Sequence, residues 1–379
     1  MIVIAATHEG GNENRVALTP ETVKKFKNLG AEVRLQSGAG KRSSYLDIAY
    51  EETGAVIMPT AAAALDGADI VLKVRRPSAE ELAAIKPGAA LAAILDPYDA
   101  ADEIQTLANA NIVAFAMEFM PRKTRAQSMD VLSSQANLSG YKAVVDAASL
   151  FNRAFPMMMT AAGTVPAARV FIMGVGVAGL QAIATARRLG AVVSATDVRP
   201  ATKEQVESLG AKFVAVEDEE FKQAETAGGY AKEMSDEYKK KQAELVASHI
   251  TNQDIVITTA LIPGRPAPKL ISREMVETMK PGAIIIDLAA ERGGNCELTM
   301  PGEIVEHHGV RISGPVNLPG QIAGNASALY ARNLYAFIEP MIDKENKTLN
   351  INWDDEIVTG TALTRDGKII HPRLTGEQA

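Results

Sequence analysis

The sequence predicts an α/β protein with two Rossmann-like domains, each built on a parallel, doubly wound sheet. Short apolar runs alternate with helical segments along most of the 379 residues, which is typical of strand–helix–strand units. A glycine-rich turn joins an apolar run to a helical segment in the middle of the chain, and a further helical segment follows the last predicted strand. We therefore expect a discontinuous first domain, residues 1–135 plus 323–379, and a second domain at residues 136–322.

The first domain is expected to alternate strands with helices from its beginning. Its first helix starts at Thr19 and Pro20, because threonine is a frequent N-cap and proline suits the first turn, and it stops before Gly30. A second helix is predicted at residues 45–53. The predicted strands are short apolar runs at residues 2–6, 31–36, 70–74, 89–95 and 112–117.

A polar segment, residues 121–137, interrupts this alternation directly after a predicted strand. Loops at the carboxyl ends of parallel strands are where such sheets bind ligands. The segment is therefore a candidate binding loop, and an exposed linker is the alternative. A long helix is predicted to follow at residues 138–151, and the methionines at 157–159 are interpreted as core residues.

The glycine-rich turn lies between the apolar run that begins at Arg169 and a helical segment that ends near Gly190. Gly174 permits a tight turn, Gly176 lets the backbone approach a pyrophosphate, and Gly179 lets the helix pack close to the strand. The helix N-terminus then presents free N–H groups to the phosphates. This context predicts a dinucleotide site, and a purely structural strand–helix turn is the alternative.

An acidic residue, Asp197, ends the second apolar run of this unit. A carboxylate at this position accepts hydrogen bonds from an adenosine ribose and repels a 2′-phosphate, so NAD is favoured over NADP. Arg199 lies two positions later and leaves NADP open as the alternative.

The remainder of the second domain continues the same alternation. Helices are predicted at residues 202–209 and 236–246, and strands at residues 212–216, 254–260, 283–287 and 310–313. A helix predicted at residues 323–337 then carries the chain back onto the first domain. Residues 217–253 are long and highly charged for a connection within a compact domain. They form either an exposed helical excursion or a mobile flap beside the cofactor.

Composition excludes several classes of protein. The net charge is −7 without a long run of like charge, so no nucleic-acid partner is expected. Cys296 is the only cysteine, which excludes an internal disulfide framework and suits a reducing compartment. The five histidines show no metal-ligand spacing, so no metal is expected. The apolar runs are shorter than the roughly 20 residues that span a bilayer, so no direct membrane insertion is expected.

Several motifs resemble those of a known family. They are Arg125–Asp130 and the segments 155–163, 176–186, 201–210 and 225–234. The chain resembles the alanine dehydrogenase and transhydrogenase superfamily, and within it the NAD(H)-binding domain I of proton-translocating nicotinamide nucleotide transhydrogenases, in the bacterial form with a split alpha subunit. The resemblance implies Re/Si-specific hydride transfer from NADH to NADP⁺ held by a partner subunit. It also implies membrane subunits that couple this transfer to proton translocation, a homodimer, and a cytoplasmic position on the inner membrane.

The resemblance also implies the site residues. Arg122, Gln127 and Asp130 are the implied catalytic residues, which orient the nicotinamide. The implied cofactor-binding residues are Arg122, Lys123, Thr124, Gln127, Asp130, Ser133, Gly174, Val175, Gly176, Val177, Gly179, Asp197, Val198, Arg199, Gly229, Tyr230, Gln242 and Leu261.

Departures from alanine dehydrogenase concern its proton-transfer groups. The lysine of that enzyme falls at Arg75, its histidine at Asp96 and its aspartate near Glu291, whereas its arginine is retained at Arg15. Oxidation of an amine to an imine needs acid–base groups, whereas hydride transfer between two nicotinamides needs positioning and exclusion of water. Two alternatives are an amino acid dehydrogenase that uses Arg75 and Asp96, and a non-enzymatic NAD-binding module.

Overall fold

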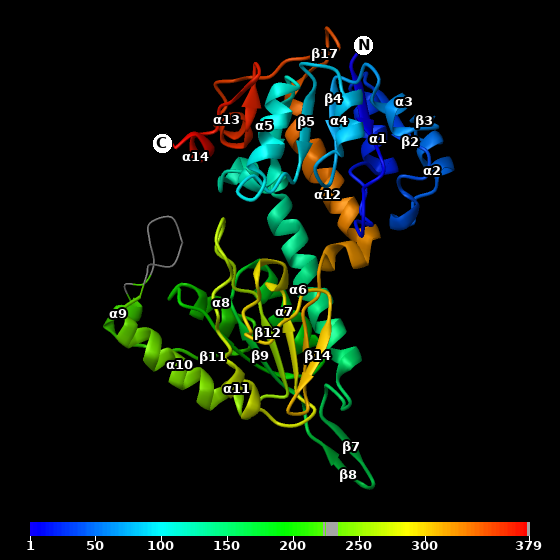
Figure 1. The fold of residues 1–379 in the computed structure, drawn as a ribbon. Helices are drawn as coiled ribbons and strands as arrows, with labels where there is room; N and C mark the ends of the chain where they lie inside the picture. Colours follow the sequence, from blue (N-terminus) through cyan, green and yellow to red (C-terminus); the bar gives the residue numbers. More distant parts are fainter. Residues whose placement is uncertain (223, 225–233, 377–379) are drawn as a thin grey trace. The chain divides into compact units, whose positions relative to one another are not determined.

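The computed structural model describes residues 1–222, 224 and 234–376 (Figure 1). The chain divides into two compact units. Unit 1 comprises residues 1–135 and the chain from residue 319 onward, and unit 2 comprises residues 136–318. Helix α6 (Val131–Leu150) begins in unit 1 and ends in unit 2.

Unit 1 contains a six-stranded parallel sheet with the strand order β3-β2-β1-β4-β5-β6. The chain starts at the centre of the sheet and winds outward in both directions, which is the order of a doubly wound fold. The strands are β1 (Val3–Ala6), β2 (Glu32–Gln36), β3 (Val56–Met58), β4 (Ile70–Leu72), β5 (Ala90–Ala93) and β6 (Val113–Ala116).

Helices cover both faces of this sheet, because alternate residues of a strand point to opposite sides. Ile4 packs in one buried cluster with side chains of α1 (Pro20–Asn28) and α12 (Ala323–Ile338). Ala5 packs in another with α3 (Ala61–Leu65) and α5 (Ala101–Asn109). Helix α12 therefore completes the core of a sheet formed by a distant part of the chain. The other elements of unit 1 are α2 (Asp47–Glu51), α4 (Ala79–Ala84), α13 (Glu356–Thr361), α14 (Pro372–Thr375), and the short pairs β16 (Ile342–Asp343) with β17 (Thr348–Leu349) and β18 (Thr364–Arg365) with β19 (Lys368–Ile369).

Unit 2 contains a seven-stranded sheet with the order β11-β10-β9-β12-β13-β15-β14. Its strands are parallel except β14, which pairs antiparallel with β15 at one edge. The strands are β9 (Arg169–Met173), β10 (Val192–Thr196), β11 (Lys212–Phe213), β12 (Ile255–Thr258), β13 (Ile284–Asp287), β14 (Ile304–His307) and β15 (Val310–Ser313).

Two buried clusters again lie on opposite faces of this sheet. One contains side chains of α6, α7 (Val177–Arg188) and α8 (Thr202–Ser208). The other contains side chains of α10 (Asp236–Ile250) and α11 (Arg273–Glu277). A short helix, α9 (Glu219–Lys222), precedes α10. The predicted class, α/β with parallel doubly wound sheets, is therefore confirmed.

Three local predictions are wrong. Helix α6 begins at Val131, not at residue 138, because a cap at Asp130 starts it inside the polar segment. Strand β14 is missing from the prediction, since four residues before a two-residue turn carry little signal. The methionines at 157–159 are not core residues: their exposed fractions are 62%, 42% and 80%, and the last two lie in the hairpin of β7 (Met158–Thr160) and β8 (Gly163–Val165).

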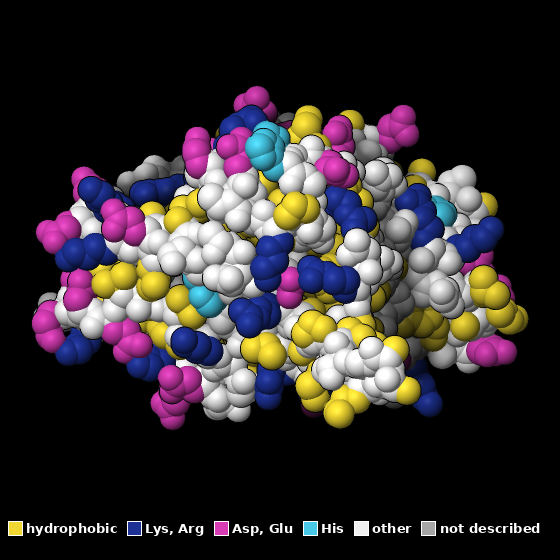
Figure 2. Space-filling model, turned by 90° about the horizontal axis from the view of Figure 1, so that it is seen from below, with side chains coloured by type: hydrophobic (Ala, Val, Ile, Leu, Met, Phe, Trp, Pro, Cys, Tyr) yellow, Lys and Arg dark blue, Asp and Glu magenta, His cyan; other side chains and the backbone are white. Residues whose placement is uncertain are grey.

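This hairpin projects from unit 2 and pairs with no other strand of the described chain (Figure 1). Figure 2 looks onto the end of unit 2 from which the hairpin projects, and hydrophobic side chains gather at that surface. Among the described residues, none of the helices combines the length and the apolar character that crossing a bilayer requires.

Candidate functional site

The glycine turn of unit 2 connects β9 to α7. Gly174 adopts a φ of +98°, and a Cβ there would lie 2.6 Å from Thr259 Oγ1. A Cβ on Gly179 would lie 2.0 Å from the carbonyl oxygen of Gly174. Gly176 is different, because a Cβ on it would meet nothing within 4 Å. The outer glycines are therefore required by the fold, whereas the space beside Gly176 is open to a ligand.

The open side of the turn carries the properties expected of an anion site. Helix α7 begins at Val177, so its first N–H groups and the positive end of its dipole lie at the turn. Val175 is buried, whereas Val177, Val198 and Leu261 are exposed apolar side chains on three different loops or helix ends. This combination suits a molecule with both phosphate groups and flat apolar rings.

Asp197 follows β10 and holds the turn in place. Its Oδ2 accepts a hydrogen bond from the Val175 N–H at 2.7 Å, and its Oδ1 accepts from the Arg199 N–H at 2.9 Å. The Arg199 guanidinium also donates to both carboxylate oxygens at 2.9 Å and to the Val175 carbonyl at 3.1 Å. The carboxylate thus already accepts four hydrogen bonds, so a ribose hydroxyl has to compete with Arg199 for it.

Gln242 is a residue that sequence reasoning alone does not single out, because it lies in a charged helix. Its side chain connects the end of β10 to the loop that follows β11: Nε2 donates to Thr196 Oγ1 at 3.0 Å, and Oε1 accepts from the Val216 N–H at 3.0 Å. It therefore supports the carboxyl end of β10, one residue before Asp197. Gly229 and Tyr230 lie outside the described residues.

The polar segment of unit 1 contains the remaining predicted site residues. Arg122, Lys123, Thr124 and Gln127 are exposed. Lys123 forms an ion pair with Glu356, and Arg125 Nη1 donates to Asp355 Oδ2 at 2.9 Å. The 3₁₀ segment Thr124–Met129 packs against α12, where Asn333 Nδ2 donates to the Ser128 carbonyl at 2.8 Å. Acidic residues at the start of α13 and a buried helix together hold this segment.

Asp130 and Ser133 form the start of α6. Asp130 Oδ1 accepts from the Ser133 N–H at 2.9 Å, which is an N-cap contact, and its Oδ2 accepts from Ser133 Oγ at 2.5 Å. Ser134 Oγ donates to Asn333 Oδ1 at 2.7 Å, which ties the same turn to α12. The structure therefore brings Asp130 and Ser133 together, and the two residues stabilise the first turn of α6.

A partly buried ionic cluster in unit 1 joins three positions singled out above, namely Arg15, Arg75 and Asp96. Glu13 receives two hydrogen bonds from the Arg15 guanidinium, at 2.7 and 2.8 Å, and one from Arg75 Nε at 3.2 Å. Arg75 lies 3.7 Å from an Asp96 carboxylate oxygen, and Arg15 donates to Gln135 Oε1 at 2.8 Å. Glu291, by contrast, is an exposed residue of unit 2.

Glu13 is the residue of this cluster that the sequence did not reveal. Burial alone raises the pKa of its carboxyl, but hydrogen bonds and charge from Arg15, with charge from Arg75, outweigh burial and lower the pKa to about 2. Glu13 is thus an anion bound to two arginines. An acid two residues before an arginine was the available signal.

Two further buried carboxyl groups of unit 1 behave in the opposite way. Burial raises the pKa of Glu9 to about 7, against the opposing charge of Lys73. Burial also raises the pKa of Glu118 to about 7. Glu118 Oε1 accepts from the backbone N–H groups of Leu95 and Asp96, whereas Oε2 is buried without a hydrogen-bond partner in the described part of the chain.

Comparison with known proteins gives a consistent result. Residues 6–139 match the family described as alanine dehydrogenase/PNT, N-terminal domain, and residues 143–372 match its C-terminal domain. An NAD(P) transhydrogenase subunit alpha chain of Rhodospirillum rubrum is 59% identical over 97% of this chain and 97% of its own length.

Solved structures of related proteins agree with the sequence matches. The structure of a transhydrogenase from Sinorhizobium meliloti has 57% identity and a TM-score of 0.89, and covers 98% of this chain and 100% of its own. An L-alanine dehydrogenase with 22% identity and a TM-score of 0.83 covers 99% of both chains and shares the fold. The chain therefore belongs to the alanine dehydrogenase/PNT family and, within it, to the NAD(P) transhydrogenase alpha subunits.

Proposed function

We propose that unit 2 binds NAD(H) at the turn between Gly174 and Gly179. The observation that carries the proposal is the open space beside Gly176, between two glycines that have no room for a side chain. In this proposal, backbone N–H groups at the start of α7 hold the pyrophosphate, and Val175 and Val177 line the turn.

The adenosine ribose is held by Asp197, Val198 and Arg199. Binding of its hydroxyls at Asp197 requires Arg199 to give up part of its pairing with that carboxylate, and the negative charge of the carboxylate disfavours a 2′-phosphate beside it. Gly229, Tyr230, Gln242 and Leu261 complete the proposed contacts of unit 2. The clear relation to NAD(P) transhydrogenase alpha subunits supports this assignment.

The polar segment of unit 1 holds the nicotinamide end of the cofactor. Arg122, Gln127 and Asp130 orient the ring, and Lys123, Thr124 and Ser133 contact the ring or its ribose. The reduced nicotinamide supplies a hydride when it is bound. These residues position the ring and exclude water, and none of them donates a proton in the chemical step.

The reaction is direct hydride transfer from NADH to NADP⁺ held by a partner subunit. The state of Glu13 supports this reaction over amino acid oxidation. A small amino acid would have to displace a buried carboxylate from Arg15 and Arg75, at the position where the related dehydrogenases use a cationic site. Transfer between two nicotinamides needs no such site.

The proposed assembly follows from the same relation. The chain acts as a homodimer with an NADP(H)-binding subunit and a membrane subunit, on the cytoplasmic face of the inner membrane, where proton translocation is coupled to the transfer. The exposed β7–β8 hairpin supports a dimer, because an isolated two-stranded hairpin with exposed apolar side chains gains stability only by packing on another surface.

One experiment tests the proposed function. The purified chain is titrated with NADH and NADPH, and it is then mixed with a competent NADP(H)-binding subunit. We expect tighter binding of NADH than of NADPH, and transfer between nucleotides only in the mixture. Binding of NADH without transfer would leave a binding module, and alanine oxidation by the chain alone would establish a dehydrogenase instead.

A further inference from the structure

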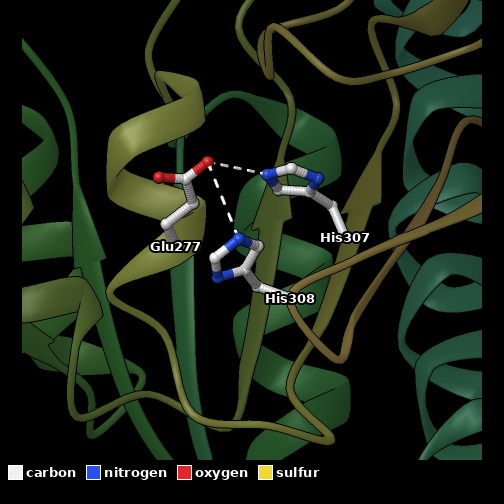
Figure 3. A group of neighbouring side chains, drawn as sticks. All are labelled: Glu277, His307 and His308. Atoms are coloured by element: carbon white, nitrogen blue, oxygen red, sulfur yellow. Dashed lines mark hydrogen bonds and ion pairs between the residues drawn. The ribbon is translucent and has the colours of Figure 1, made fainter.

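Two histidines and a glutamate meet on the surface of unit 2, away from the glycine turn in the sequence. Glu277 is the last residue of α11, His307 is the last residue of β14, and His308 follows in the turn to β15. Figure 3 shows both imidazole rings directed toward the Glu277 carboxylate. Because the acid lies 30 residues before His307, no spacing rule in the sequence reveals the group.

The ligand atoms lie at distances that a metal ion can bridge. His307 Nε2 lies 2.9 Å from Glu277 Oε1, and His308 Nε2 lies 4.0 Å from the same oxygen. One ligand atom from each residue falls within 4.8 Å of the others. Bonds of 2.0–2.1 Å to a tetrahedral ion place ligand atoms roughly 3.3 Å apart, so the exposed His308 ring has to move toward the Glu277 oxygen and the His307 nitrogen has to move slightly away from it.

The backbone around the group is well defined. His308 and Gly309 both have positive φ values, 50° and 75°, which is the conformation of a tight type I′ turn between antiparallel strands. The Gly282 N–H donates to the Gly309 carbonyl at 2.7 Å, so the turn is attached to the loop that follows α11. The ligands are therefore presented by fixed elements, which reduces the entropy lost when an ion binds.

We propose that Glu277, His307 and His308 bind one divalent transition-metal ion of the zinc class. Imidazole nitrogens favour Zn²⁺, Co²⁺, Ni²⁺ and Cu²⁺ over Mg²⁺ and Ca²⁺, which prefer oxygen ligands. Three protein ligands leave a fourth position for water, and the partly exposed side chains leave access for it. The ion fastens the edge strand β14 to α11 and thereby stabilises unit 2.

The chain offers variants that test this site without disturbing the fold. His308→Asn preserves the turn, because asparagine before glycine is favoured in a type I′ turn. His307→Gln and Glu277→Gln remove the other ligands at exposed or half-buried positions. Glu306→Gln is the matched control: Glu306 precedes His307 in β14 and points to the opposite side of the strand.

The measurement uses Co²⁺, followed by Zn²⁺ competition, on protein purified without a histidine tag. We expect the natural chain and Glu306→Gln to bind one Co²⁺ with a visible absorption band that Zn²⁺ abolishes. Each ligand variant should weaken binding by at least the roughly tenfold that loss of a supporting residue costs. Zn²⁺ should raise the melting temperature of the natural chain and the control only.

Two results would overturn the proposal. One is equal Co²⁺ affinity in the natural chain and in a variant with all three ligand positions changed. The other is binding that falls equally in Glu306→Gln, which would mean that surface charge attracts the ion. Either result would leave Glu277 and the histidines as a hydrogen-bonded surface group only.

Discussion

Asp130 illustrates how one side chain serves both a helix and a proposed site. Its carboxylate caps α6 through the Ser133 N–H, a contact that typically stabilises a helix by about 1 kcal/mol. The sequence indicated a polar, ligand-directed segment here, but it did not reveal that the helix begins at the next residue. Aspartate is a frequent N-cap residue, but this polar segment contains several other residues of the capping type, and the sequence does not show which of them begins the helix.

The first prediction separates these two tasks. Asp130→Asn keeps the cap, because asparagine caps helices as well as aspartate, and removes only the charge. We expect hydride transfer to slow by about tenfold, which corresponds to the difference between a charged and a neutral hydrogen bond. The NADH dissociation constant should change much less. Single-turnover transfer with the partner subunit and NADH titration provide the two values.

Ser128→Ala, on the same segment, serves as the control and should leave both values unchanged. Equal losses of transfer rate and of NADH affinity in Asp130→Asn would assign the carboxylate to binding alone.

For Asp197, the residue type was enough to predict a ligand contact, but the sequence did not reveal which residues surround its carboxylate. An acid at the end of the second strand predicts a ribose contact, yet only the structure shows that Arg199 already occupies the carboxylate. These surroundings were not predictable, because they include residues that are distant in the sequence. Gln242 reaches the same region from a helix 46 residues beyond Thr196, and no local pattern marks such a contact.

At the scale of elements, the sequence succeeded where structure is local. The glycine turn was predicted with the correct roles for Gly174 and Gly179, because a positive φ and close packing depend on a few neighbouring residues. The β7–β8 hairpin was not predicted, because the exposure of its methionines depends on whether a distant surface covers them. A run of methionines shows that a surface is apolar, but it does not show whether the same chain or another one covers it.

The second prediction concerns this hairpin. Replacing Met158 and Met159 together by aspartate should convert the proposed dimer into a monomer, because charges would be buried in an apolar contact. Sedimentation over a range of concentrations gives the mass, and circular dichroism checks the fold.

Met300→Asp is the matched control, since Met300 is also an exposed methionine of unit 2. A double variant with the mass of the natural protein would remove the hairpin from the interface.

At the scale of the whole molecule, strand–helix alternation was enough to predict two doubly wound sheets. The buried ionic groups of unit 1 were not predictable, because they come from β1, β4 and β6 or the loops that follow them. Residues from separate strands meet only after the sheet has formed, and polar residues between apolar runs otherwise indicate ordinary loops.

The third prediction concerns the pH dependence of unit 1. The folded pKa of Glu118, about 7, lies above its ordinary value of 4.5. The stability that its protonated form contributes is therefore complete below pH 4.5 and is lost as the pH rises through 7. Glu118→Gln should reduce the fall in the free energy of unfolding between pH 5 and 8, by on the order of 2 kcal/mol.

Trp353 is the only tryptophan and packs against Phe115 in unit 1, so its fluorescence reports the unfolding of this unit. Glu345→Gln, an exposed acid of the same unit, should leave the pH dependence unchanged. A Glu118→Gln variant with the same pH dependence as the natural chain would exclude a raised pKa for Glu118.

The glycines of the turn differ in whether the fold itself would tolerate another amino acid in their place. Every amino acid substitution at position 179 adds at least a methyl group where a Cβ would lie 2.0 Å from a carbonyl oxygen, so the fold itself excludes the substitution. At position 176 the backbone φ is −80° and a Cβ would meet nothing within 4 Å. Folding therefore tolerates alanine there, and a selection for glycine at this position would have to come from a bound molecule.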